Sequence, residues 1–321
     1  MDLEMLQRRA GIIRQIRSFF NDKNYLELDT PLLSEALIPE SCLEVFETQR
    51  ILPNGKIVPY WLIPSPEIWM KKIIAKHKVS VFQICKCFRN GESSGFLHNP
   101  EFTMLEYYTI NADYMDSLKL TEELFSFLTQ GKTVALHPPF KRLTVFDAFK
   151  TYAGFDLFAA AQKSGGLEKE ACSLGLDPAP DLDTGTLYDL IFIHNIEPEL
   201  KKLGPLALLD YPAFIPCLAK KNPDGKTVQR WELYFNGIEL ANCYSEQTDV
   251  KLVQDFFESE TKEKEKKALV KHKIDSNFCK IFETGFPACS GVALGLDRLI
   301  MAICGKSSID SVLPLPIQTF I

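Results

Sequence analysis

The segment 88–102 gathers residue types that could bind a nucleoside triphosphate. Arg89 carries a planar guanidinium group that can make paired hydrogen bonds to a phosphate, and His98 could reach an outer phosphate. Phe102 offers a ring face on which adenine could stack. The sequence therefore predicts a nucleotide-binding loop, although a solvated loop whose charges bind nothing would have the same composition.

The residues on either side of this loop are expected to hold it in place. Residues 81–87 and 103–108 are rich in the aromatic and branched side chains that favour strands. They predict an antiparallel hairpin whose long loop has a flexible tip at Ser93, Ser94 and Gly95.

A second candidate phosphate ligand lies near the other end of the chain. Gly291, Ala293 and Gly295 alternate along a predicted strand, so that small residues line one face where a ligand or another backbone can approach closely. Arg298 follows in the first turn of a predicted helix and could point at the same ligand. The alternative is a tight strand–helix contact with a surface arginine.

Together these segments resemble motifs 2 and 3 of the class II aminoacyl-tRNA synthetases. Residues 25–33, with Pro31 after a predicted helix at 2–22, are similar to motif 1 of that family, which lies at a dimer interface. The helix is expected from the spacing of Leu6, Ile13, Ile16 and Phe20. The resemblance implies an α/β (α+β type) fold, in which an antiparallel β-sheet is flanked by helices, and a homodimer.

Three further segments resemble the lysine branch of the family: 63–72, 98–106 and 237–246. Only 24 residues precede Tyr25, too few for the anticodon-binding barrel of a lysyl-tRNA synthetase. We therefore expect a single catalytic domain over residues 1–321, with a small helical insertion at about 144–203. This truncated form, and Ala293 in place of a glycine, resemble the elongation factor P–(R)-β-lysine ligases, which are paralogues of lysyl-tRNA synthetase.

The resemblance implies ATP and Mg²⁺ as cofactors. Arg89 would contact the α-phosphate and Arg298 the γ-phosphate, and these two arginines are the expected catalytic residues. The remaining implied ATP ligands are Asn90, Glu92, His98, Asn99, Phe102, Glu239, Leu240 and Gly295.

The same resemblance implies a site for a diamino acid. Glu246 and Tyr108 match residues that hold the side-chain ammonium, and Glu67 matches the residue that receives the other amine. A buried ammonium needs a carboxylate partner, so two separate carboxylates favour lysine or (R)-β-lysine over a neutral amino acid. The other implied substrate contacts are Ser65, Pro66, Asn242, Tyr244 and Ala293. Cys243 and Gln247 depart from the family pattern and leave the specificity for the acceptor open.

Glu232 and Glu239 are the implied metal ligands. They are seven residues apart, which would place them on opposite faces of one unbroken strand. Asn236-Gly237 between them is a strong signal for a two-residue turn, so a hairpin that brings both carboxylates together is expected. The alternative is a pair of acids that face solvent.

Composition limits the choice of partners and location. The chain has a formal net charge of −6, whereas a tRNA-binding protein usually presents an excess of basic residues, so tRNA is not the expected acceptor. Nine cysteines without paired spacing predict free thiols and no zinc site. No signal peptide or membrane-spanning run is expected, which favours a cytoplasmic protein.

The leading hypothesis is thus ATP-dependent activation of (R)-β-lysine or lysine and its transfer to a lysine side chain of elongation factor P. Two alternatives stay open: a truncated lysyl-tRNA synthetase-like enzyme that charges RNA, and a non-catalytic regulatory paralogue. Intact Arg89, Glu92, Glu232, Glu239 and Arg298 argue against the second alternative.

Overall fold

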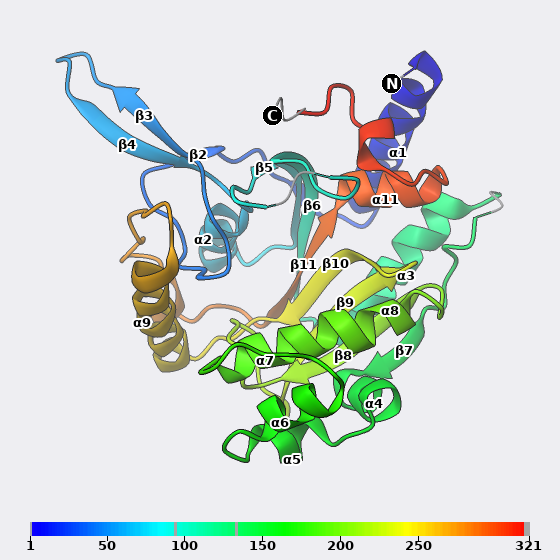
Figure 1. The fold of residues 1–321 in the computed structure, drawn as a ribbon. Helices are drawn as coiled ribbons and strands as arrows, with labels where there is room; N and C mark the ends of the chain where they lie inside the picture. Colours follow the sequence, from blue (N-terminus) through cyan, green and yellow to red (C-terminus); the bar gives the residue numbers. More distant parts are fainter. Residues whose placement is uncertain (1, 93–94, 132–133, 318–321) are drawn as a thin grey trace. The chain divides into compact units, whose positions relative to one another are not determined.

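A computed structural model describes residues 2–92, 95–131 and 134–317 of the chain. The predicted loop tip at Ser93 and Ser94 lies outside these residues. The chain forms two compact units: unit 1 comprises Met1–Ala112 and Glu246–Ile321, and unit 2 comprises Asp113–Ser245. In each unit a mainly antiparallel sheet is flanked by helices (Figure 1), so the predicted mixed α/β fold class is confirmed.

Four hydrogen-bonded strands form the sheet of unit 1 that carries the predicted nucleotide loop. Their order is β1 (Leu26–Glu27), β5 (Val81–Phe88), β6 (Glu101–Ile110) and β11 (Cys289–Gly295). β5 and β6 are antiparallel, which confirms the predicted hairpin, and β11 runs antiparallel to β6. Gly291 lies opposite Tyr108 and Ala293 opposite Glu106, so these four residues share one face of the sheet.

A second, three-stranded sheet of unit 1 has the order β2 (Leu33–Ser34), β4 (Ile57–Leu62) and β3 (Glu47–Ile51). The β3–β4 hairpin extends as an arm at the upper left of Figure 1. Its base is anchored where Trp61 and Ile63 pack in a small core with Leu37 and Val45.

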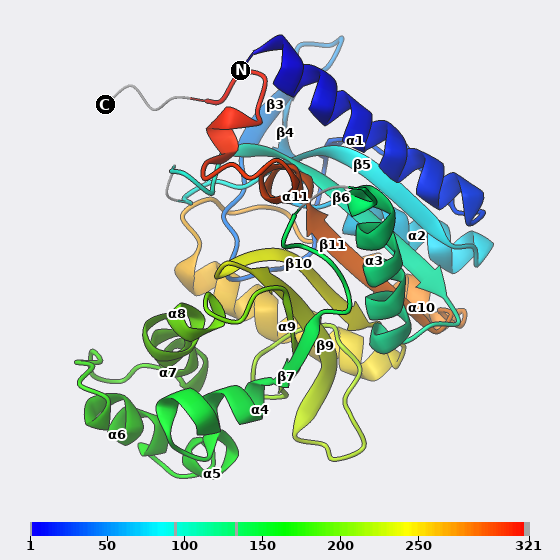
Figure 2. The same cartoon turned by 90° about the vertical axis from the view of Figure 1, so that its right-hand side faces the viewer.

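The helices of unit 1 begin with α1 (Leu3–Asp22), where the side chain of Asp2 caps the helix by accepting a hydrogen bond from Met5 N. α1 runs beside β5 (Figure 2), and its Phe20 ring stacks on Phe82 at 4.9 Å between centroids. Leu6, expected in the apolar stripe, is 39% exposed, because the packed face of α1 passes through Met5 and Ile12 before it reaches the expected Ile16 and Phe20. The remaining helices are α2 (Glu67–His77), α9 (Val250–Lys267), α10 (Lys280–Glu283), α11 (Leu296–Ile303) and the 3₁₀ turn η3 (Ile309–Ser311).

Unit 2 contains four strands in the order β10 (Ile238–Ser245), β9 (Thr227–Phe235), β8 (Leu206–Pro212) and β7 (Lys141–Thr144). β9 and β10 form an antiparallel hairpin around Asn236-Gly237. Both turn residues have positive φ, 52° and 76°, the conformation that a tight hairpin turn requires and that Asn and Gly adopt most readily. The predicted hairpin is therefore confirmed.

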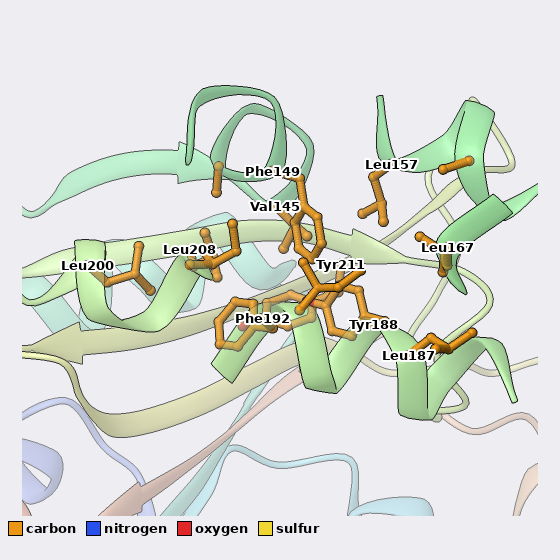
Figure 3. Packing of buried hydrophobic residues seen from close by; sticks show 14 of the residues in the cluster. Val145, Phe149, Leu157, Leu167, Leu187, Tyr188, Phe192, Leu200, Leu208 and Tyr211 are labelled. Carbon is orange, nitrogen blue, oxygen red and sulfur yellow. The ribbon is translucent and has the colours of Figure 1, made fainter. Parts of the chain in front are cut away.

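Most helices of unit 2 lie within residues 144–203, the segment predicted to be a small helical insertion. The helices of this unit are α3 (Tyr114–Thr129), α4 (Val145–Ala148), η1 (Phe149–Ala153), α5 (Leu157–Ala161), α6 (Gly166–Ser173), α7 (Thr184–Ile191), η2 (Phe192–Ile196) and α8 (Glu197–Leu200). Figure 3 shows Phe149, Tyr188 and Phe192 packed together with Leu208 and Tyr211 of β8. The helices of residues 144–203 thus cover one face of the unit 2 sheet with a dense apolar core.

No helix in the described ranges is long and apolar enough to cross a membrane. All nine cysteines, each within those ranges, are free.

Candidate active site

Arg298 and His98 meet in unit 1. Arg298 lies in the first turn of α11, where its Nε donates to Leu97 O at 3.2 Å and its Nη2 lies 2.9 Å from His98 Nε2. Burial and the nearby guanidinium group lower the pKa of His98, so the imidazole is neutral and accepts from Arg298 through Nε2. Two groups predicted to contact outer phosphates are therefore adjacent, although they lie 200 residues apart in the sequence.

A buried ion pair holds the start of α11. Arg9 on α1 reaches Asp297 with 2.7 Å between Nη2 and Oδ1, and both side chains are less than a tenth exposed. The same Nη2 donates to Thr103 Oγ1, and Thr103 N donates to Asp297 Oδ2 at 2.7 Å. Because Asp297 precedes Arg298 in the chain, this network ties the arginine-bearing turn to α1 and β6.

Arg89 follows β5 directly, and the hydrogen bond from its backbone N to Pro100 O closes the base of the loop at 3.0 Å. Its guanidinium lies over the Phe102 ring, 5.2 Å from Cζ to the ring centroid, and 3.8 Å from Glu92. Arg89, Glu92 and Phe102, all predicted to contact ATP, are therefore neighbours, and the Arg89 side chain is half-buried against the aromatic ring.

A cluster of carboxylates in unit 1 surrounds one lysine. Glu67 and Lys71 lie one turn apart on α2, and Lys71 Nζ is 2.5 Å from Glu67 Oε1 and 2.6 Å from Glu246 Oε2. Lys71 is fully buried. Both acids predicted to receive the two amines of a substrate thus share a resident ammonium group. We call Glu67, Glu106, Glu246 and Lys71 the carboxylate cluster.

Glu106 is the third acid of this cluster and was not predicted. It is 2% exposed and accepts from Ser65 Oγ at 2.8 Å and from the Tyr108 hydroxyl at 2.9 Å. Burial, with a smaller contribution from Glu67, raises the pKa of Glu106 to about 8. Burial also raises the pKa of Glu246 to about 7 against the opposing effect of Lys71. The cluster therefore holds more buried acid than its one lysine can balance.

Gly291 makes room for this cluster. A Cβ atom at Gly291 would lie 2.5 Å from Tyr108 Cε1 and 3.0 Å from Glu246 Oε1. The strand was predicted to admit a ligand or another backbone, but at Gly291 the atoms that approach belong to two side chains, those of Tyr108 and Glu246. Glu246 Oε1 finds no hydrogen-bond donor among the described residues.

The predicted metal ligands lie in unit 2, on the β9–β10 hairpin. Glu239 is opposite Tyr234, which is two residues from Glu232, so both acids share a face of the sheet. A bulge at Leu240 places Asn242 opposite Glu232. Glu232 accepts from the hydroxyls of Tyr211 and Tyr234 and pairs with Arg230 Nη2 at 2.5 Å.

These contacts bear on Mg²⁺ binding. Both acids carry the carboxylate oxygens that Mg²⁺ prefers; Glu239 is half-buried, and Glu232 is buried and paired with Arg230. Within the described part of the chain there is no group of three or more His, Cys, Asp or Glu residues that could hold a metal by themselves.

The structure places the remaining predicted residues as follows. Asn99 is buried and its side chain is bonded to Glu101 O and Ile317 N, and Asn90 donates to Val45 O. Gly295 caps the start of α11, and Pro66 precedes α2. Leu240, Asn242 and Tyr244 lie on β10 in unit 2.

Sequence reasoning missed three buried polar residues. Lys71 could have been found from its i, i+4 spacing to Glu67 on a predicted helix. Glu106 could have been found from its i, i+2 spacing to Tyr108. Gln83 lies opposite Glu106 on β5 and is 1% exposed, and neither of its amide atoms has a partner in the described ranges. No local pattern marks Gln83, because only the strand register places it beside Glu106.

Comparison with known proteins identifies the class. The sequence profile of the class II tRNA synthetases (D, K and N) matches residues 3–319, and the chain therefore belongs to this family. Within it, the chain is 36% identical over 318 residues to the elongation factor P–(R)-beta-lysine ligase of Avibacterium paragallinarum, an alignment that covers 98% of this chain and 96% of the relative. The predicted resemblance is thus confirmed.

Proposed function

We propose that the chain activates (R)-β-lysine or lysine with ATP and transfers it to a lysine side chain of elongation factor P. The observation that carries the proposal is the carboxylate cluster. Two acids, Glu67 and Glu246, contact a single resident ammonium, and a third, the buried Glu106, interacts electrostatically with Glu67 and Lys71. Buried carboxylates require cationic partners, so a diamino acid is a better ligand for this cluster than a neutral one.

In the proposed first step, a carboxylate oxygen of the amino acid attacks the α-phosphorus of ATP. The bond to the β-phosphate oxygen breaks, and pyrophosphate leaves with its electron pair. Arg89 meets the charge at the α-phosphate and Arg298 that at the γ-phosphate, since positioning and charge neutralisation are the main contributions that a protein makes to phosphoryl chemistry. The half-buried guanidinium of Arg89 and the neutral His98 beside Arg298 support these roles.

In the second step, the acceptor amine attacks the carbonyl carbon of the aminoacyl-adenylate, and AMP leaves. A neutral amine is needed for the attack, and its proton is released as the amide forms. The acceptor is a proposal that rests on the relative from Avibacterium paragallinarum. Elongation factor P acts in translation, so we further propose a cytoplasmic location.

We propose Mg²⁺ as the second cofactor, with Glu239 as its first protein ligand. The ion would neutralise phosphate charge during activation. Glu232 is the second candidate ligand, because it is only 7% exposed whereas Glu239 is half-buried; Arg230 and two tyrosine hydroxyls also contact Glu232. Replacement of Glu239 by Gln should therefore lower Mg²⁺-dependent ATP binding, whereas the same change at Glu232 should mainly destabilise unit 2.

We also propose a homodimer that forms through the motif 1 region. Leu26 of the edge strand β1 is 52% exposed and Leu33 is 47% exposed, and Leu3 and Leu6 of α1 are exposed as well. Exposed apolar residues that cluster along one segment are typical of an interface. A symmetric dimer is the commonest assembly for such a surface.

Pyrophosphate exchange with lysine, (R)-β-lysine and norleucine tests the activation step. Norleucine has the length of lysine without the side-chain amine, so it should support little exchange. Transfer is then tested separately with elongation factor P and with tRNA as acceptors. If either diamino acid supports exchange but is transferred to tRNA and not to elongation factor P, the acceptor is RNA and the proposed acceptor is wrong. Equal exchange with norleucine would contradict the role of the carboxylate cluster.

A further inference from the structure

Lys71 is the least expected member of the carboxylate cluster. Its ammonium is fully buried and lies within 2.6 Å of both acids that the proposed function assigns to the substrate. Taking an ammonium and two carboxylates out of water is unfavourable, and such groups are often replaceable by apolar residues without loss of stability. The presence of a buried lysine at position 71 is therefore better explained by its effect on the charge of the site than by a contribution to the stability of the fold.

The geometry shows what Lys71 leaves available. It occupies Oε1 of Glu67 and Oε2 of Glu246, one oxygen of each acid. Glu246 Oε1 is buried and has no hydrogen-bond donor within the described residues, whereas Lys71 contacts the other oxygen of this carboxylate. A bound ammonium could therefore dock on Glu246 without displacing Lys71.

The formal charges of the cluster support the same conclusion. When ionised, the three acids contribute −3 and Lys71 contributes +1, so that the cluster carries −2. A diamino acid brings two ammonium groups. Without Lys71 the ionised cluster would carry −3, one negative charge more than the two ammonium groups balance. A buried carboxylate whose charge is not balanced takes up a proton.

We propose that Lys71 is the resident counter-cation of the carboxylate cluster, a positioning residue that holds Glu67 and Glu246 by one oxygen each and matches the charge of the cluster to the two ammonium groups of a diamino acid. This inference rests on the proposed function, because it assumes that the ligand is a diamino acid. Lys71 is not a catalytic residue under this proposal, since it acts through the two glutamates.

Proton release on binding separates this role from a purely structural one. The raised pKa values of Glu106, about 8, and Glu246, about 7, mean that the free cluster holds protons near neutral pH. Ammonium groups of the ligand lower these pKa values, so that binding releases protons and affinity increases as pH rises. Loss of Lys71 raises the pKa of the acids further, and binding should then release more protons.

Two other titratable groups near the cluster, Cys289 and Glu40, must be considered in the same pH range. Burial and the Glu246 carboxylate raise the pKa of the Cys289 thiol, which therefore stays neutral. Burial, followed by Glu67, raises the pKa of Glu40 to about 7, and Arg89 and Lys264 oppose this shift. Lys71 also lowers the pKa of Glu40, so the loss of Lys71 raises the pKa of Glu40 in the same direction as those of the cluster and leaves the sign of the expected change the same.

The experiment measures the binding of (R)-β-lysine and lysine by calorimetry between pH 6 and 8, in buffers with different ionisation enthalpies, which gives the number of protons released. Lys71→Met should release up to about one more proton than wild type, so that its affinity falls up to about tenfold further for each unit of decreasing pH. Lys72→Met is the matched control on the same helix. Lys72 is 33% exposed and paired with Asp275, outside the cluster, and its proton count should equal that of wild type.

A second variant keeps the test decisive if Lys71→Met does not fold. Lys71→Met combined with Glu106→Gln keeps Glu67 and Glu246 and restores the formal charge of −2. It should return the proton count to within a fraction of a proton of wild type. The inference is overturned if wild type binds the diamino acid but Lys71→Met does not show the expected proton count. If Lys71→Met does not fold, the double variant is judged by its own expected count in the same way. If wild type binds neither diamino acid, the proposed function itself fails.

Discussion

Replacement of Gly291 by alanine is the sharpest local test of the carboxylate cluster. The added Cβ would lie 2.5 Å from Tyr108 Cε1, 2.9 Å from Tyr108 Cδ1 and 3.0 Å from Glu246 Oε1. Carbon atoms do not approach this closely, so the Tyr108 ring and the Glu246 carboxylate must both move. The Tyr108 hydroxyl would then lose its 2.9 Å hydrogen bond to Glu106.

The magnitude follows from these contacts. Forcing a methyl group into a packed site costs about 1–3 kcal/mol, and leaving a buried acceptor with one donor fewer costs about 1–3 kcal/mol. We expect the free energy of unfolding to fall by about 2–4 kcal/mol, because part of the strain is relieved by movement of the ring. The KM for the diamino acid should rise by about tenfold or more, since small displacements of binding groups have large effects.

Urea unfolding and pyrophosphate exchange measure the two effects. Gly11→Ala is the matched control, because a Cβ there would meet nothing closer than Arg14 Nη2 at 4.0 Å. In the middle of α1, alanine should stabilise the helix by up to about 1 kcal/mol. A Gly291→Ala protein with wild-type stability and an unchanged KM for the diamino acid would refute the assignment of Tyr108 and Glu246 to one crowded site.

Four further predictions follow from the proposed site and assembly. Arg89→Ala and Arg298→Ala should each abolish diamino-acid-dependent pyrophosphate exchange and keep a folded circular dichroism spectrum, and exchange at wild-type rates would disprove the phosphate roles. Glu239→Gln should raise the Mg²⁺ concentration needed for half-maximal exchange, as a metal titration would show. Leu26→Glu should turn the proposed dimer into a monomer, and light scattering that finds a wild-type monomer at micromolar concentration would exclude the proposed interface. (R)-β-lysine should be activated better than lysine, and Ala293→Gly should narrow the ratio of the two kcat/KM values, because one methyl group beside the substrate backbone changes discrimination by about 1–3 kcal/mol.

Local patterns were sufficient for the elements that position the site. The β5–β6 hairpin, the Asn236-Gly237 turn and the β11–α11 connection were all predicted correctly. Each depends on interactions between near neighbours in the chain, such as strand alternation or the positive φ of two turn residues. The stripe of α1 was predicted less well: Leu6 is exposed, because the helix face that packs is chosen by the strands it meets.

The tertiary structure decided how the charges are shared. The sequence by itself determined that Glu67 and Glu246 are acids in segments that resemble substrate-binding segments, but not that one lysine lies between them. It also marked Glu232 as a candidate metal ligand without showing that Arg230 and two tyrosines hold it. The physical reason is that a buried charge is governed by whichever groups the fold brings within a few ångströms. Those groups, such as Lys71 and Glu246, can be 175 positions apart in the chain, where no local pattern records their meeting.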